Sequence, residues 1–414
     1  MNIDKMRAQE ANLVNGLLVK LSQVHAKWLE SYINVFPDIV KGRTFTYGRF
    51  GSIFKGILLQ WGITAATVLH IKKIEATYVF AGLRHRHIID VLPSSEVLVI
   101  GGRNELFYCI KKGYKFHWAG YLVKSFSLYI WSGNKGPLIS SIIYIRKLLA
   151  DDKKKRYLFL WEDTLPLGMT LSTCLEGVAG LRVVCIAHGL MARRDVTTAI
   201  QEGLNCAFNL VWDQSHIKII EGENSCKPTT FLLGLPYEVE VSQLKRRTVV
   251  LVGHLGLRND SKEYFYTMYH FCKIYKILSE AGIEVSFRPH PQDDVEFAKK
   301  IFPCINIDDK QKLFSLGRMV FIGFTSSIMY EARRFENYVI SLDISALSGS
   351  PDVQPNRILY EDEYSRLPEI ILNIFDCMPT VINNEEKKLQ SRFSECLSFI
   401  DQFEQIEINN KDPK

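Results

Sequence analysis

The chain has 414 residues and a formal net charge of +6; 47% of its residues are hydrophobic and 23% are charged. This composition is typical of a soluble globular protein, and the length exceeds one ordinary core, so two lobes are expected. The basic excess is small and diffuse, and no nucleic-acid-binding module is visible. Nucleic acid is therefore not expected as a partner.

The amino-terminal part of the chain predicts helices rather than a leader or a membrane span. Residues from about 1 to 75 contain leucines at helical spacing, beginning with Leu13. The apolar stretch Ile53–Ile71 includes Lys55, which favours a buried helix over a membrane span. No signal-peptide pattern opens the chain, and the nine cysteines are scattered singly without metal-ligand spacing. We expect a cytoplasmic protein with reduced thiols.

Short apolar strands then alternate with helices in two series. In the first series the predicted strands cover residues 77–82, 97–102, 156–161, 182–187, 209–212 and 230–234, and the predicted helices cover residues 138–149 and 170–179. In the second series the predicted strands cover residues 248–253, 283–288, 318–323 and 338–342, and the predicted helices cover residues 265–281, a segment from Ile328, and residues 385–405. Continuous apolar strands between helices indicate parallel sheets that are covered on both faces.

The predicted fold class is therefore α/β, with two Rossmann-like lobes preceded by a helical segment. The first lobe is expected over residues 1–240 and the second over residues 248–385, followed by a terminal helix and tail over residues 386–414. The polar stretch Glu238–Arg247 is interpreted as the linker between the lobes.

Open α/β sheets bind ligands at the carboxyl ends of their strands, so residues there are the candidates for function. One second-lobe strand ends in Arg288-Pro289-His290-Pro291, where two prolines stiffen the turn that carries His290. Arg288 adds a permanent positive charge suited to phosphate. His290 in such a turn can donate to a phosphate or act as a general acid toward a leaving phosphate.

Two further strand ends of the second lobe suit an anion. A run of three small hydroxyl residues stands at a helix start, and a glycine-rich turn allows close backbone approach. Glu331 follows on the same helix, within expected reach of a ribose or base. The predicted donor-binding residues are Gly253, His254, Gly256, Arg288, Pro291, Thr325, Ser326, Ser327 and Glu331.

The first lobe offers carboxylates instead. Glu162 and Asp163 follow an apolar strand directly, and one of them could serve as the base that deprotonates an acceptor hydroxyl. At a neighbouring strand end His188, Gly189 and Arg193 are candidates for binding phosphate or acceptor. The segment 101–105 is a weaker candidate for an acceptor pocket, and a purely structural role is the preferred interpretation there.

Together these residues resemble GT-B fold glycosyltransferases of bacterial surface polysaccharides. The resemblance is greatest to sialyltransferases and capsule Kdo transferases, which use CMP-activated acidic sugars, and extends to CDP-glycerol and CDP-ribitol phosphotransferases. His290-Pro291 matches a motif that contacts the CMP phosphate, and Ser326-Ser327 matches one that binds phosphate or carboxylate. Glu162-Asp163 resembles the motif that supplies the base, with Thr164 where glycine is expected. His188-Gly189 resembles an element of the polyol-phosphate and Kdo groups.

The resemblance implies an inverting sugar transfer from a nucleotide sugar, with a CMP-linked acidic sugar favoured, to a surface polysaccharide or lipid-linked glycan. Glu162 or Asp163 is the expected base, and His290 and Arg288 are expected to stabilise the leaving phosphate without a metal or cofactor. Contact with the inner membrane would be peripheral. The alternatives are a CDP-polyol phosphotransferase and a non-catalytic sugar-nucleotide-binding subunit of an assembly complex.

Overall fold

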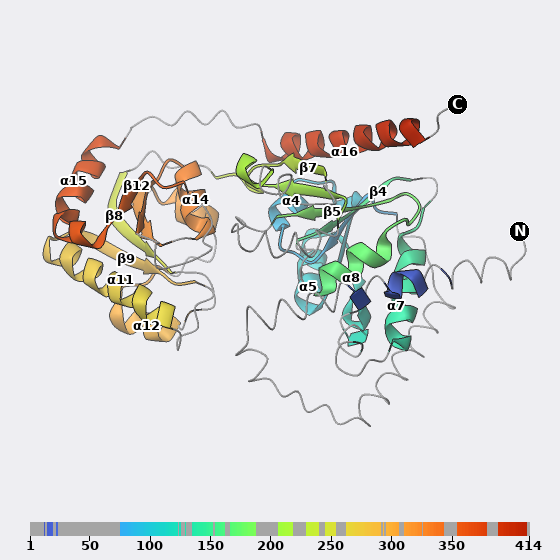
Figure 1. Ribbon diagram of the computed structural model, residues 1–414, viewed down its shortest axis with the longest axis horizontal. Coiled ribbons are helices and arrows are strands. Elements are labelled where there is room, and N and C mark those ends of the chain that lie inside the picture. Colours follow the sequence, from blue (N-terminus) through green and yellow to red (C-terminus); the bar gives the residue numbers. More distant parts are fainter. Residues whose placement is uncertain are drawn as a thin grey trace, which may run out of the picture. The chain divides into compact units, whose positions relative to one another are not determined.

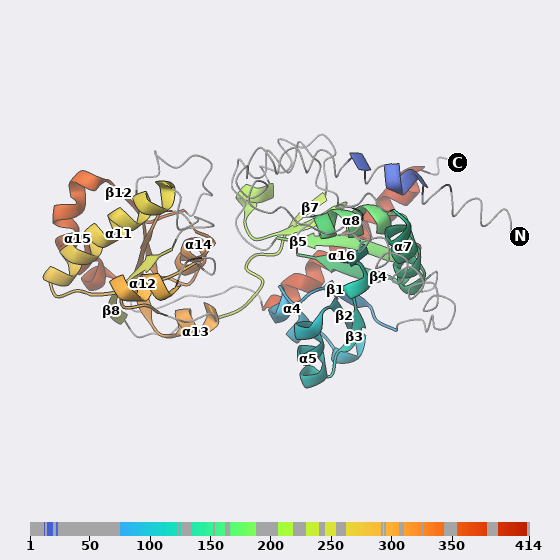
Figure 2. The same ribbon diagram turned by 90° about the horizontal axis from the view of Figure 1, so that it is seen from below.

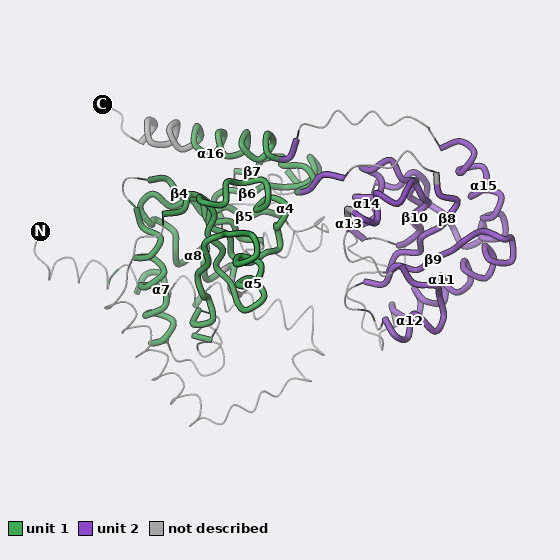
Figure 3. The backbone as a smooth tube through the Cα atoms, turned by 180° about the vertical axis from the view of Figure 1, so that it is seen from behind, with its two compact units in different colours: residues 1–188, 197–236, 390–414 green, residues 189–196, 237–389 purple. Residues whose placement is uncertain are grey.

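In the computed structural model the chain divides into two compact units, shown in green and purple in Figure 3. Unit 2 runs from Tyr237 to Leu389, and unit 1 contains the elements before it and the terminal helix after it. The structure describes residues 12, 15–19, 22–23, 75–122, 124–125, 129, 135–151, 154–161, 166–187, 206–217, 229–239, 245–253, 262–290, 293, 295–305, 310–324, 326–342, 354–378 and 388–411.

Unit 1 is built on a seven-stranded sheet in the order β3-β2-β1-β4-β5-β6-β7, and every neighbouring pair is parallel. The predicted α/β class is thereby confirmed for this unit. The strands are β1 (Tyr78–Ala81), β2 (Val97–Gly101), β3 (Lys115–Trp118), β4 (Arg156–Leu160), β5 (Leu181–Ile186), β6 (Phe208–Val211) and β7 (Thr229–Leu232).

The helices of unit 1 cover both faces of this sheet (Figure 2). They are α4 (Arg86–Asp90), the short 3-10 helix η1 (Ser94–Glu96), α5 (Arg103–Lys112), α7 (Gly136–Leu149), α8 (Pro166–Leu175) and α16 (Leu389–Lys411). Helix α8 begins at Pro166 and not at residue 170 as predicted, because proline favours the first helical turn. Helix α5 was not predicted from the sequence; it begins at Arg103, directly after Gly101 ends β2 and Gly102 caps the helix.

The terminal helix α16 packs on unit 1 although it follows unit 2 in the sequence. Phe393 lies in ring contact with Phe159 of β4, with centroids 5.2 Å apart. The Tyr157 hydroxyl donates to Asp401 at 2.7 Å, and the Arg392 guanidinium donates to the Leu233 carbonyl at 2.8 Å. Helix α16 thus packs across the part of the first sheet that runs from β4 to β7.

Unit 2 has a five-stranded parallel sheet in the order β12-β11-β10-β8-β9 (Figure 1). The strands are β8 (Lys245–Val252), β9 (Glu284–Arg288), β10 (Arg318–Gly323), β11 (Tyr338–Leu342) and β12 (Arg357–Leu359). Strand β8 begins at Lys245, so the basic triplet that we assigned to the linker belongs to the sheet. All six residues of β10 are buried, as its apolar run predicts.

The helices of unit 2 are α11 (Lys262–Glu280), α12 (Val295–Ile301), α13 (Lys310–Ser315), α14 (Ser327–Arg334), η2 (Glu361–Arg366) and α15 (Leu367–Cys377). The larger core cluster lies between the sheet and helices α11 and α15, and includes Phe271, Phe287 and Ile371. The helices predicted within residues 1 to about 75 lie almost wholly outside the described residues. Among the described helices, none is long and apolar enough to span a membrane.

Candidate functional site

Three neighbouring strands of unit 2 bring predicted donor residues to one sheet edge. Because the order is β10-β8-β9, the strand ends place Ser326, Gly253 and Arg288 side by side in that sequence. Neighbouring strands are about 4.8 Å apart, so the outer two strand ends are separated by roughly 10 Å. This edge is the carboxyl end of the sheet, where ligands of open α/β folds bind.

Gly253 at the middle strand end lies in close contact with the turn that carries His290. Its amide donates to the Arg288 carbonyl at 2.8 Å. A Cβ atom at position 253 would lie 2.6 Å from the His290 amide nitrogen and 2.6 Å from Asp293 Oδ2. Only glycine allows this approach. The predicted role of Gly253 in binding the donor stays a prediction.

The His290 turn is held by Asp293, which the sequence analysis did not single out. Asp293 Oδ2 accepts a hydrogen bond from the His290 amide at 2.7 Å, and the Asp293 amide donates to the His290 carbonyl at 2.9 Å. Burial raises the pKa of Asp293 to about 6, although the backbone hydrogen bond opposes this shift. The signal was available, because an Asp three residues after the turn is typical of side-chain capping of backbone amides.

Helix α14 starts at the end of β10, with Ser326 as its N-cap residue in extended conformation. The Ser326 carbonyl accepts from the Met329 amide at 2.9 Å, while the Ser326 side chain makes no capping hydrogen bond. Ser326 is buried and Ser327 half-buried. The first amides of a helix have no partner within it and favour an anion. The predicted binding of an anion by Ser326 and Ser327 stays a prediction.

Glu331 is fully buried on α14, and its carboxylate accepts a hydrogen bond from the Tyr237 hydroxyl. Burial, then the charge and hydrogen bond of Glu331, raise the pKa of Tyr237 well above its ordinary value, while the nearby Arg288 charge lowers it. Tyr237 therefore links Glu331 to Arg288 electrostatically. The predicted contact of Glu331 with a ribose or base stays a prediction. Tyr237 was missed because nothing in its local sequence marks it.

Unit 1 has a mostly apolar pocket of about 440 Å³ at the carboxyl ends of β1 to β4. Its lining includes Gly82, Gly101, Glu105 and Trp161. Glu105 Oε2 accepts from the Gly102 amide at 2.8 Å, which caps α5 and turns this carboxylate back onto the backbone. The weaker candidate segment 101–105 thus contributes to the lining of this pocket. Trp161, which directly precedes Glu162 in the sequence, lines the same pocket.

Several predicted residues lie outside the described part of the chain, so their geometry is not part of this site. They are Glu162, Asp163, His188, Gly189, Arg193, His254, Gly256, Pro291 and Thr325. Their predicted roles stay predictions. Among the described residues, no group of three or more His, Cys, Asp or Glu side chains is arranged to hold a metal ion.

No family model matches the chain, and no curated protein matches it. Solved structures with a similar fold include a glycosyltransferase from Rickettsia africae, at 9% identity and a TM-score of 0.45 over 73% of this chain and 88% of that one. Wall teichoic acid polymerase TagF matches at 11% identity and a TM-score of 0.45, over 88% of this chain and 100% of that one. A UDP-GlcNAc 2-epimerase from Methanocaldococcus jannaschii matches at 13% identity and a TM-score of 0.41, over 78% of this chain and 99% of that one. Likenesses this distant assign no activity.

Proposed function

We propose that the chain is a glycosyltransferase that binds a nucleotide sugar at the carboxyl edge of unit 2. The observation that carries the proposal is the row formed by Ser326, Gly253 and the Arg288–His290 turn on three adjacent strands. A span of roughly 10 Å exceeds one phosphate and suits a phosphate with its nucleoside and sugar attached. Arg288 and the start of α14 supply positive potential from both ends of this row.

The proposed reaction is an inverting transfer to a surface polysaccharide or lipid-linked glycan. The acceptor hydroxyl gives its proton to Glu162 or Asp163 and its oxygen attacks the anomeric carbon of the donor. The bond from that carbon to the nucleotide phosphate breaks, and the phosphate leaves with the electron pair. Arg288, His290 and the helix amides near Ser326 stabilise the charge that develops there, which needs no metal or cofactor.

A thermal-shift panel of CMP, CDP, UDP and GDP tests the proposal, because a ligand that binds only the folded protein raises its Tm. We expect a shift with CMP, and its loss in H290A and in S326A, because both positions face the proposed phosphate. The control is S394A on α16 in unit 1, which should leave the shift unchanged. A shift with UDP or GDP alone would refute the CMP preference, and a shift with CDP alone would favour polyol-phosphate transfer.

Turnover separates an enzyme from a binding subunit. With CMP-sialic acid or CMP-Kdo and a glycan acceptor, we expect release of CMP, and we expect little in the paired variant E162A/D163A. If the wild-type protein binds CMP but releases none from any donor, the non-catalytic alternative gains. If E162A/D163A transfers as well as wild type, the base lies elsewhere.

The outward face of α5 in unit 1 supports the proposed peripheral contact with an anionic membrane. Arg103, Phe107, Ile110 and Lys111 recur at helical spacing, and Phe107 and Ile110 are 58% and 69% exposed. The Arg103 guanidinium lies 5.6 Å from the Phe107 ring centroid. Trp118 of the edge strand β3 is also exposed. Aromatic and basic side chains together are suited to the interface of an anionic bilayer.

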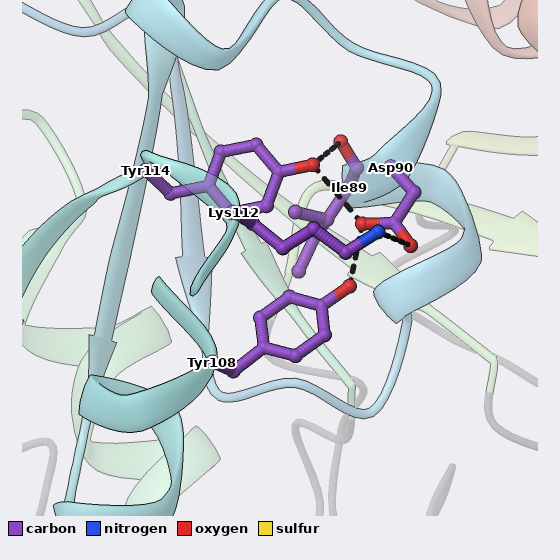
Figure 4. A network of polar contacts seen from close by, with 5 residues as sticks. All are labelled: Ile89, Asp90, Tyr108, Lys112 and Tyr114. Carbon is purple, nitrogen blue, oxygen red and sulfur yellow. Dashed lines mark hydrogen bonds and ion pairs between the residues drawn. The ribbon is translucent and has the colours of Figure 1, made fainter. Parts of the chain in front are cut away.

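The side of α5 next to α4 is fixed by a polar network centred on Asp90 of α4 (Figure 4). Asp90 accepts from the Tyr108 hydroxyl at 2.5 Å, the Tyr114 hydroxyl at 3.0 Å and the Lys112 amine at 3.1 Å. This network fixes the orientation of α5, so Arg103, Phe107 and Ile110 stay together on its outward face. Co-sedimentation with phosphatidylglycerol vesicles tests the contact. We expect F107S/I110S to lose binding, and equal binding by wild type and variant would contradict it.

A further inference from the structure

Unit 2 has a cavity of about 810 Å³ that shares no residue with the candidate donor site. Its lining comes from the last turn of α14, the first residues of β11 and β12, and one side of α15. Helix α15 has 11 residues and so extends for roughly 16 Å along the cavity. These dimensions suit an extended ligand rather than a single small ion.

The cavity is rich in arginine. Arg333, Arg334, Arg357 and Arg366 line it, against two glutamates. Arg357 is paired with Glu363, and this pairing fixes the direction of its guanidinium. Arg333 and Arg366 form no ion pair with any residue in the described ranges. Arg366 ends η2 and is the N-cap residue of α15, and its charge helps to lower the pKa of Glu363 in the preceding turn.

The remaining polar lining is suited to hydroxyl groups. Asn356, Asn373 and Tyr338 present amide and phenol groups, which hydrogen-bond hydroxyls as donors and acceptors. Two hydrogen bonds fix Asn356 to Val339 of β11. The side-chain oxygen of Asn356 accepts from the Val339 amide at 2.9 Å, and the backbone amide of Asn356 donates to the Val339 carbonyl at 2.8 Å. This wall of the cavity is therefore preorganised.

Backbone strain is concentrated at the same cavity. Among the described non-glycine residues, Glu336 and Gln354 have positive φ, at 58° and 48°, and both line it. Left-handed backbone is disfavoured for residues with a Cβ, and such outliers gather at functional sites. Glu336 directly follows the C-cap of α14, where glycine is usual. The Asn337 side chain holds this turn through three hydrogen bonds, with Met319, Ala332 and Phe335.

We propose that this cavity binds an anionic saccharide, a polyhydroxyl ligand that carries carboxylate or phosphate groups. Guanidinium groups match both anions in a planar, two-pronged geometry, and the amides take the hydroxyls. A transferase that elongates an acidic polymer would hold part of that polymer here, away from the reacting end. The site itself rests on the cavity alone and stands without the proposed function.

Calorimetric titration of the full chain tests the proposal with three probes: a galacturonate oligomer, glucose 1-phosphate and inorganic phosphate. We expect the two saccharides to bind more tightly than inorganic phosphate. R333A/R366A should weaken saccharide binding by about tenfold or more, since it removes charged hydrogen bonds. N373L should weaken saccharide binding but leave inorganic phosphate unchanged. The matched control K300A/K312A removes the same charge from exposed lysines of unit 2 outside the cavity.

Alkylation gives a readout at the site itself. Cys377 lines the cavity and is exposed, whereas Cys272 is exposed on α11 outside it. Saturating galacturonate should slow alkylation at Cys377 and leave Cys272 unchanged. H290A should retain this protection, which separates the cavity from the donor site. Equal protection of both cysteines, equal loss in K300A/K312A, or equal affinity for inorganic phosphate and saccharides would overturn the proposal.

Discussion

Replacing Gly253 with alanine tests whether the middle strand end positions the His290 turn. The new Cβ would lie 2.6 Å from the His290 amide nitrogen, where ordinary contacts begin at 3.4 Å, so the turn must move by 3.4 − 2.6 = 0.8 Å. The atoms that the new Cβ would meet are the backbone amide nitrogen of His290 and the Asp293 carboxylate that caps this turn. The strain cannot be relieved by rotating a flexible side chain.

Overpacking of this kind costs about 1–3 kcal/mol, and weakening the hydrogen bond from Gly253 to Arg288 adds about 1 kcal/mol. For a unit of this size we expect Tm to fall by on the order of 5–10 °C. A displacement near 1 Å can reduce the effectiveness of a positioned group by about a hundredfold. We therefore expect CMP affinity to fall by at least about tenfold in G253A.

Differential scanning calorimetry and nucleotide titration measure the two effects separately. Gly282 is the matched control, because a Cβ there meets nothing within 4 Å, yet its φ of 73° makes alanine unfavourable. G282A should lose stability while keeping its CMP affinity, since it lies at the opposite end of β9. The reasoning fails if G253A matches wild type in both Tm and affinity, or if G282A loses CMP affinity to the same extent.

Three further outcomes are expected. The pKa of Asp293 is raised to about 6, so the folded state favours the protonated carboxyl. Its contribution to stability is therefore full below about pH 4 and is lost as pH rises through 6. The Tm difference between wild type and D293N should follow this pH dependence, and a difference that does not change with pH would contradict it. Y237F removes the hydroxyl that donates to the buried Glu331 carboxylate and should lower the free energy of unfolding in urea by about 1–3 kcal/mol. Y237F/E331Q should recover part of that loss, because the second change removes the buried charge. Equal stability of the single and double variants would count against an interaction between Tyr237 and Glu331. Burial opposes ionisation of Asp90, but hydrogen bonds from Tyr108, Lys112 and Tyr114 outweigh this effect and lower the pKa of Asp90. Wild type should therefore have a higher Tm than D90N above about pH 4, and this difference should shrink below pH 4. A Tm difference that persists at pH 2 would refute the reasoning.

The strands could be predicted because burial on both faces leaves a plain trace in the sequence. Strand β10 is an apolar run whose every residue is buried, and its predicted bounds match the observed ones. Helix α5 was not predicted, because the sequence after the strand shows no Ser, Thr, Asp or Asn at the N-cap position. Gly102 is the N-cap of that helix, and Glu105 accepts from the Gly102 amide, which is the one half of a capping box that a glycine can form.

The candidate site could be predicted only where its residues are consecutive. Arg288 to His290 form one short motif at a strand end, and the structure places them beside Gly253 as the topology of a parallel sheet requires. Tyr237 meets Glu331 across 94 positions of sequence, and no local pattern encodes that meeting. Such contacts depend on the packing of side chains across the whole unit, which periodicity does not reveal.

The position of α16 sets an order in which the chain can fold during synthesis. The bond between Tyr157 and Asp401 joins residues 244 positions apart, and all of unit 2 lies between them. A ribosome therefore releases the whole of unit 2 before the helix that covers Phe159 and Leu233 is made. Unit 2 is an insertion that can fold first, whereas the first sheet keeps apolar surface uncovered until helix α16 emerges. A chain stopped before Gln390 would keep that surface open to chaperones or to other unfinished chains.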